Sequence, residues 1–141
     1  MSTRFSAAMP TAFVSASFAD RESLAPVLDA IKRALVTAGY QPHVFIERYT
    51  FARDDARQMM ATTLRDVRAS DLLIAETTHK AIGVGIEVGA AAAWEIPIVA
   101  VRHASTEPST TVGGLAAASV TYRDADDLHA GLCAALADLA S

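Results

Sequence analysis

The stretch DLLIAETTHKAIGVGIEVGAAAAWEIPIVAVR, residues 71–102, decides the fold. It opens with an apolar run, DLLIAE (71–76), and closes with another, IPIVAVR (96–102), each of the length of a buried strand. Between them a glycine-rich loop leads into an alanine-rich helix that we expect to end near Trp94. Two apolar strands joined through a helix predict a parallel pair with a crossover connection.

The same alternation continues on both sides of this stretch. Apolar runs predict further strands at TAFVSAS (11–17), HVFIE (43–47) and ASVTY (118–122). We expect Ser23 to cap the helix after the first strand, with Pro26 in its first turn. Apolar residues at helical spacing predict the inner faces of three helices: Leu24, Val27, Leu28, Ile31, Leu35 and Ala38; Ala56, Met59, Met60, Thr63, Leu64 and Val67; Leu128, Leu132, Leu136 and Leu139.

Strands rich in valine and isoleucine that alternate with helices predict a parallel sheet with helices on both faces. The predicted fold class is therefore α/β, a doubly wound Rossmann-like or flavodoxin-like domain with about five parallel strands. With 141 residues and no interdomain linker, we expect a single domain over residues 1–141.

Ligands of doubly wound α/β sheets bind at the carboxyl ends of the strands. HASTEPSTTVGGLAA (103–117) is predicted to be one long irregular segment, and such loops are usually functional or disordered.

The composition argues against several functions. Apolar residues make up 52% of the chain and charged residues 20%, which is typical of a globular protein. The apolar stretches are broken well short of the roughly 18 residues that suggest a membrane span. The net charge of −4 argues against a nucleic-acid polymer as partner. The single cysteine, Cys133, excludes an internal disulfide and fits a reducing cytoplasm, and the four histidines lack the spacing of a metal site.

The segment GVGIEVG (83–89) combines three glycines with one acid, Glu87. Its spacing differs from the G-x-G-x-x-G of a dinucleotide site, and no P-loop sequence occurs. Gly83 and Gly85 permit a ligand to approach a helix N-terminus, and we expect Glu87 in the first turn, where the helix dipole favours the ionised carboxylate. Such a carboxylate suits nucleophilic attack on a sugar anomeric carbon. A structural explanation is equally open, since glycines permit tight packing and acids are favoured in first turns.

Residues 71–101 closely resemble the central segment of the 2′-deoxynucleoside 5′-monophosphate N-glycosidases and, more distantly, of the nucleoside 2-deoxyribosyltransferases. Both families have a strand that opens with aspartate, a loop, a G-x-G-[YF/I]-E-[LV]-G motif and a helix of small residues. The match covers residues 60–102 well and the rest in outline. The resemblance implies that Glu87 takes up the deoxyribosyl group covalently, after which water completes hydrolysis or a second base completes transfer. It implies no metal and no cofactor, since two carboxylic groups can cover both catalytic roles.

The resemblance also implies contacts to a 5′-phosphate. The loop after the first strand offers Ser15 and Ser17. A serine of the hydrolases is replaced here by Ala81, and the adjacent Lys80 would supply a charge in its place. A serine that reaches a neighbouring subunit's phosphate corresponds to the region of Ser109, Thr110 and Thr111. A solvated polar loop explains this region equally well.

The second acid of both families is missing from its usual place. They have an aspartate eight residues before the aspartate that opens the strand, and that position here is Thr63. Asp66 lies one turn further along the same predicted helix. It would either protonate or orient the leaving base from a shifted position, or simply pair with Arg65, Arg68 or solvent.

Three further residues are candidates for substrate contacts. Glu76 ends a strand on the expected ligand edge and would bind a sugar hydroxyl or position Glu87. His79 sits on the glycine loop beside Lys80. Tyr49 belongs to the segment RYTF, which would form an apolar wall for a base. For the neighbouring methionines we favour core packing.

The sequence therefore predicts a cytoplasmic N-glycosidase that acts on a nucleoside or its 5′-monophosphate and that forms at least a homodimer. Two alternatives stay open. The protein would be a nucleoside 2-deoxyribosyltransferase if a second base takes the sugar, or a nucleotide-binding module without catalysis, as the missing aspartate at Thr63 would allow.

Overall fold

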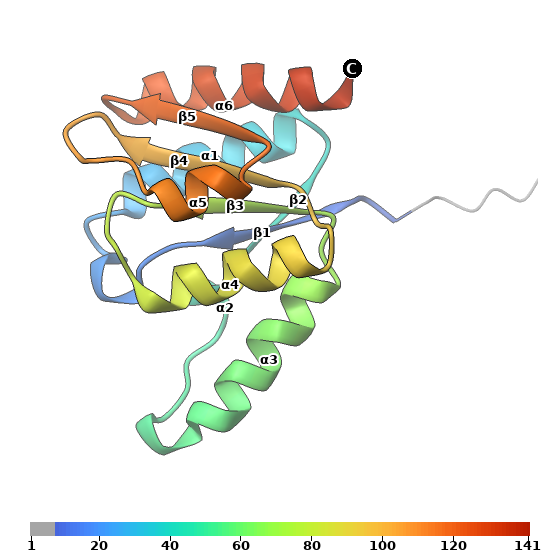
Figure 1. The fold of residues 1–141 in the computed structure, drawn as a ribbon, viewed down its shortest axis with the longest axis vertical. Coiled ribbons are helices and arrows are strands. Elements are labelled where there is room, and N and C mark those ends of the chain that lie inside the picture. Colours follow the sequence, from blue (N-terminus) through green and yellow to red (C-terminus); the bar gives the residue numbers. More distant parts are fainter. Residues whose placement is uncertain (1–7) are drawn as a thin grey trace, which may run out of the picture.

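Five parallel strands form the centre of the computed structural model, which describes residues 8–141 (Figure 1). Their order in the sheet is β2-β1-β3-β4-β5. The winding direction changes between β1 and β3, which places the expected ligand edge at the carboxyl ends of these two strands. Of the domain predicted over residues 1–141, residues 1–7 lie outside the described part. The strands are β1 (Thr11–Ser15), β2 (Gln41–Val44), β3 (Leu72–Glu76), β4 (Ile98–His103) and β5 (Ala118–Tyr122).

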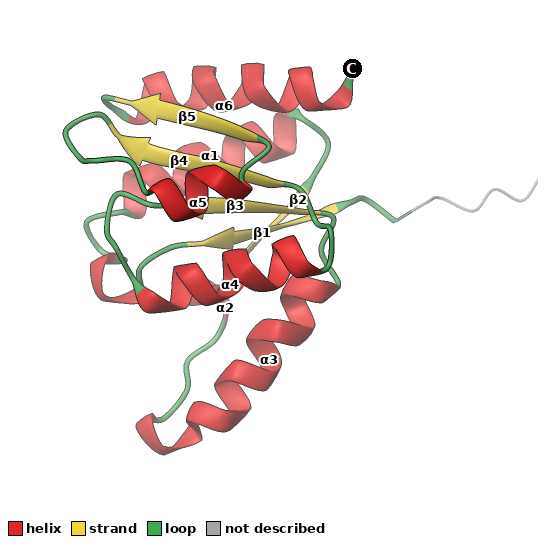
Figure 2. Cartoon of the chain, in the orientation of Figure 1, coloured by secondary structure: helices red, strands yellow, loops and turns green. Residues whose placement is uncertain are grey.

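Helices cover both faces of the sheet (Figure 2). One face packs against α1 (Ala25–Thr37) and α6 (Ala125–Ala140). The other packs against α2 (Phe45–Arg48), α3 (Ala56–Arg68), α4 (Ile82–Ala93) and α5 (Thr110–Leu115). Two 3₁₀ turns, η1 (Phe18–Asp20) and η2 (Arg53–Asp55), lie in the connections. This arrangement confirms the predicted α/β fold with five parallel strands.

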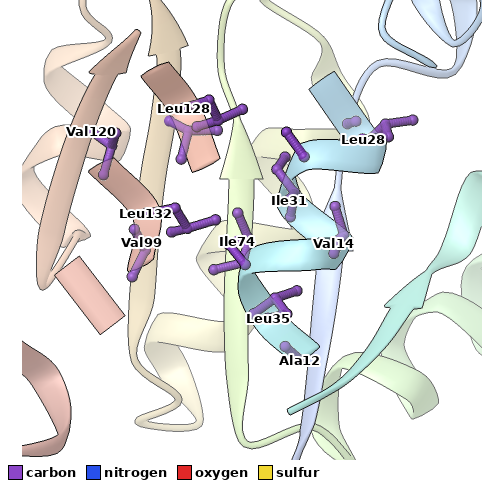
Figure 3. Close-up of a cluster of buried hydrophobic side chains, with 14 of the residues drawn as sticks. Ala12, Val14, Leu28, Ile31, Leu35, Ile74, Val99, Val120, Leu128 and Leu132 are labelled. Atoms are coloured by element: carbon purple, nitrogen blue, oxygen red, sulfur yellow. The ribbon is translucent and has the colours of Figure 1, made fainter. Parts of the chain in front are cut away.

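The three central strands, β1, β3 and β4, are buried on both faces, which explains why their sequences are continuous apolar runs. In Figure 3, Val14 and Ile74 face α1, while Val99 faces α6. The alternate residues Phe13 and Leu73 face the second layer of helices. Each large apolar side chain that is fully buried in this way contributes about 1.5–3 kcal/mol to stability.

Two predicted elements were wrong in part. The strand predicted over residues 43–47 ends at Val44, and Phe45 begins the short helix α2. β2 is an edge strand, and a short apolar run does not distinguish a strand from a buried helical turn. The segment expected to be irregular contains α5, whose cap is Ser109: its Oγ accepts a hydrogen bond from the backbone N–H of Val112.

The start of α1 also differs from the prediction. The helix is preceded by Leu24 rather than capped by Ser23, whose Oγ donates to the backbone carbonyl of Asp20. Pro26 does lie in the first turn, where its missing N–H has no consequence. Over residues 8–141, every helix is too short or too polar to span a bilayer.

Candidate active site

Glu87 lies in the second turn of α4, one turn later than predicted. The helix begins at Ile82, so Gly83 and Gly85 belong to it rather than to a preceding loop. Glu87 Oε1 accepts a hydrogen bond of 2.5 Å from Ser15 Oγ at the end of β1. A Cβ atom at position 83 would lie 4.0 Å from Glu87 Oε2. That distance is an ordinary van der Waals contact, so Gly83 places no side-chain atom beside this second oxygen, and an alanine there would still fit.

The electrostatic environment of Glu87 differs from the expected one. Burial raises the pKa of Glu87 to about 7, while the hydrogen bond from Ser15 acts in the opposite direction. The sequence placed Glu87 in the first turn, where the helix dipole favours the charged form; it lies one turn later, and burial favours the neutral form there. Near neutral pH both protonation states of Glu87 are populated. A carboxyl group with this pKa has enough basicity to act as a nucleophile once ionised.

A cavity of about 250 Å³ opens beside Glu87 and Gly83. Its walls are mostly apolar, and four aromatic residues and two methionines contribute to them: Phe18, Phe45, Tyr49, Phe51, Met59 and Met60. The first turns of α3 lie away from the sheet (Figure 1), so Met59 and Met60 reach this cavity as well as the core. We expected them to serve only core packing. The size and lining suit a flat heterocyclic ring.

A second cavity, of about 300 Å³, lies against the first turn of α4. Ala81 and Val84 line both cavities, so the two adjoin across the start of this helix. The second cavity collects several of the predicted substrate-binding residues: His79, Lys80, Gly85, Ser109 and Thr111. A helix N-terminus, a lysine and hydroxyl groups together form a suitable environment for an anion. Thr110 is not among the residues that line it.

Glu76 and Ser17 are held by other partners. Glu76 is 1% exposed, and its two oxygens accept hydrogen bonds from Thr78 N (2.7 Å), Thr78 Oγ1 (2.8 Å) and Tyr122 Oη (2.6 Å). The structure thus does not favour the interpretation of Glu76 as a ligand for a sugar hydroxyl. Ser17 Oγ donates to Asp20 Oδ2 at 2.6 Å, and His79 Nδ1 lies 3.5 Å from the same carboxylate oxygen.

Asp66 does not line the cavity of Glu87, whereas Thr63 does. Asp66 belongs to a separate cavity of about 230 Å³, where Oδ2 is 2.9 Å from His43 Nε2 and Oδ1 is 3.0 Å from Arg65 Nε. Burial opposes ionisation, but the hydrogen bonds from Arg65 and His43 hold the pKa of Asp66 below its usual range. Such an acid is a poor proton donor. The structure therefore favours the pairing with Arg65 that the sequence left open, joined by a histidine that we did not anticipate.

The fold is shared with solved structures of low sequence similarity. A conserved protein from Enterococcus faecalis is 21% identical, with a TM-score of 0.67, over 89% of this chain and 98% of its own. A CMP N-glycosidase from Clostridium botulinum is 16% identical, with a TM-score of 0.58, over 92% and 98%. A 2-deoxyribosyltransferase from Bacillus psychrosaccharolyticus is 15% identical, with a TM-score of 0.67, over 89% and 95%. These likenesses establish the fold, while no protein-family model and no curated protein matches the sequence.

Proposed function

We propose that this protein hydrolyses the bond between base and sugar in a nucleoside or a nucleoside 5′-monophosphate, with Glu87 as the nucleophile. The observation that carries the proposal is the position of Glu87. Among residues 8–141 it is the only carboxylate that lines the apolar cavity, and one of its oxygens accepts a hydrogen bond from Ser15. The fold it shares with a CMP N-glycosidase and a 2-deoxyribosyltransferase is consistent with this chemistry.

The proposed reaction has two steps. Oε2 of the ionised Glu87 attacks C1′ of the sugar, and the base leaves with the electron pair of the glycosidic bond. Water then attacks C1′ of the glycosyl ester, which releases the sugar and restores the carboxylate. The hydrogen bond from Ser15 to Oε1 fixes the plane of the carboxylate, and Gly83 places no side-chain atom beside Oε2.

The two adjoining cavities suggest how a nucleotide would lie. The base would occupy the aromatic cavity, and the sugar would cross the first turn of α4 at Ala81 and Val84. A 5′-phosphate would then reach Lys80 and Ser109 in the second cavity. A Lys80→Ala variant should raise KM for a 5′-monophosphate and leave KM for the matching nucleoside unchanged.

We also propose that two copies associate through the outer face of α4. Ile82 is 85% exposed and Ile86 is 45% exposed, and the helix continues with small residues toward Ala93. Covering these side chains would remove apolar surface from water, and the small residues permit close helix packing. Sedimentation should give a dimer for the wild type, and Ile86→Lys should shift it toward the monomer.

The decisive experiment measures release of free base from a panel of nucleosides and 5′-monophosphates, in both the deoxy and the ribo series. Glu87→Ala should lose roughly 10⁴-fold in kcat/KM, as expected for removal of a nucleophile. Glu22→Ala, which removes an exposed glutamate that lines neither cavity, should retain full activity. Base exchange that depends on an added free base would instead indicate a deoxyribosyltransferase. No Glu87-dependent release under either condition would leave a nucleotide-binding module.

A further inference from the structure

The aromatic cavity beside Glu87 presents a cluster of ring faces. The centroids of Phe45 and Tyr49 lie 4.8 Å apart, those of Tyr49 and Phe51 5.8 Å, and those of Phe45 and Phe51 6.2 Å. Two rings of this cavity already lie near cationic side chains. The guanidinium carbon of Arg21 is 3.9 Å from the centroid of Phe18, and that of Arg48 is 5.8 Å from the centroid of Tyr49. These two contacts show that aromatic faces of this cluster bind cations from outside the cavity. Neither arginine lines the cavity, and its lining, all of it in the described part of the chain, includes no lysine or arginine that would repel a cationic ring.

The same cavity contains no second acid. Among its lining residues, all of them in the described part of the chain, Glu87 is the only carboxyl group. The hydroxyl of Thr63 donates to the backbone carbonyl of Met59 at 2.8 Å. The Tyr49 hydroxyl lies 3.5 Å from Arg65 Nη2, and Tyr49 also lines the neighbouring cavity of Asp66. A base bound in the aromatic cavity therefore meets no carboxylic acid besides Glu87, and while Glu87 acts as the nucleophile it cannot also protonate the base as it leaves.

This absence constrains the leaving group. A neutral base that leaves C1′ without a proton departs as an anion, which is unfavourable between apolar walls. A base that is alkylated on a ring nitrogen already carries a positive charge, and it departs as a neutral molecule. We propose that the preferred substrates are nucleosides or nucleotides with a cationic, N-alkylated base, such as a purine methylated at N7. This inference rests on the proposed function and names its substrate class.

The reaction balances without an enzymic acid. The bond between C1′ and N9 breaks, and its electron pair neutralises the positive charge of the base. The new bond joins C1′ to Oε2 of Glu87. Water then hydrolyses the ester, and one proton enters the solvent. The sum is a cationic nucleoside plus water, giving a neutral alkylated base, the free sugar and a proton. The ring faces and the ionised Glu87 both favour the cationic reactant in the bound state.

The test compares 7-methylguanosine with guanosine, and their deoxy counterparts, slightly below neutral pH, where the methylated base keeps its charge. We expect kcat/KM for the methylated substrate to be at least about 100-fold higher, because the rate then follows the ease with which the base leaves. In the inactive variant Glu87→Gln, 7-methylguanosine should bind more tightly than guanosine. Phe51→Leu should weaken the binding of 7-methylguanosine more than the binding of guanosine, because only the methylated base also loses a cation–π contact.

A matched pair of variants tests the missing acid directly. Thr63→Asp places a carboxyl group in the cavity and should raise release of guanine at least tenfold, while release of 7-methylguanine changes less than about threefold. Thr63→Asn has the same size without the acid and should give no gain. Thermal unfolding of both variants shows whether each is folded before its activity is read.

The outcomes separate this inference from the proposed function. Glu87-dependent release with less than a tenfold difference between guanosine and 7-methylguanosine would overturn the preference for cationic bases and leave the glycosidase intact. Equal binding of the two nucleosides to Glu87→Gln would also contradict it. No Glu87-dependent release from any substrate would overturn both.

Discussion

Two carboxylates at the same edge of the sheet have opposite surroundings. Glu76 at the end of β3 accepts three hydrogen bonds, from Thr78 N, Thr78 Oγ1 and Tyr122 Oη. Glu87 on α4 accepts one, from Ser15, and borders a cavity. Both residues were candidates for substrate contact on sequence alone. Glu76 is fully buried with three donors, whereas Glu87 is partly buried with one donor and an oxygen that no other group of the described chain contacts by a hydrogen bond.

The difference has a physical basis. A buried carboxylate with several donors replaces the water that it lost, and it then stabilises the turn that supplies the donors. Burial, with the hydrogen bond to the Glu76 carboxylate, raises the pKa of Tyr122 above its usual range, so this hydroxyl remains a donor. A carboxylate with a single donor remains under-solvated in its ionised form. Contact between its second oxygen and an electron-poor carbon atom would therefore stabilise it more than it would stabilise a carboxylate that already has several donors.

From this comparison we expect Glu76→Gln to cause the largest loss of stability. The amide NH₂ would face either the Thr78 or the Tyr122 donor, so one buried hydrogen bond becomes a contact between two donors. We expect the free energy of unfolding to fall by about 2–3 kcal/mol. Tyr122→Phe, which removes one donor and leaves the carboxylate two, should cost about 1 kcal/mol. Urea denaturation measures both, and a Glu76→Gln protein as stable as wild type would contradict the structural role.

Glu87→Gln should change stability in the opposite direction. The folded-state pKa of about 7 lies above the ordinary value of 4.5 for a glutamate, so the folded protein binds more protons than the unfolded chain between these values. The wild type therefore loses stability as pH rises from about 4.5 to 7, by at most on the order of 3 kcal/mol. The variant avoids this loss and should be the more stable protein at pH 8. At pH 4 the two proteins should unfold at nearly the same urea concentration.

The pH dependence of activity tests the role of Glu87. If ionised Glu87 attacks the sugar, kcat/KM for a neutral nucleoside should rise about tenfold between pH 6 and pH 8, with a midpoint near 7. A fall over the same range would mean that the protonated form is required and that Glu87 acts as an acid. The measurement uses base release at substrate concentrations well below KM, and thermal unfolding at each pH serves as the control.

The smallest effect on activity is expected for Asp66→Asn. Asp66 pairs with His43 and Arg65 in a separate cavity, so its loss should change kcat/KM by less than about threefold. Stability should fall by about 1 kcal/mol, because two hydrogen bonds to a charged group are weakened. A loss of activity near 100-fold, in a protein that melts normally, would restore Asp66 as the acid of the reaction.

Local sequence patterns were sufficient for most of the fold. Continuous apolar runs identified β1, β3 and β4, since strands buried on both faces have no polar alternation. The edge strand β5, buried on one face, was identified by its short run ASVTY. The patterns failed at α2 and α5, each shorter than two turns, where periodicity is too brief to read. The glycines of α4 were assigned to a loop because glycine is uncommon inside helices.

The amino-acid sequence by itself determined the α/β fold and singled out Glu87, because both rest on patterns between neighbouring residues. Only the tertiary structure decided which acids are free to react. Glu76 meets Tyr122 from β5, Asp66 meets His43 from β2, and Glu87 meets Ser15 from β1. Each of these partners is more than twenty residues away in the chain, and whether a carboxylate is satisfied depends on the atoms that folding brings beside it.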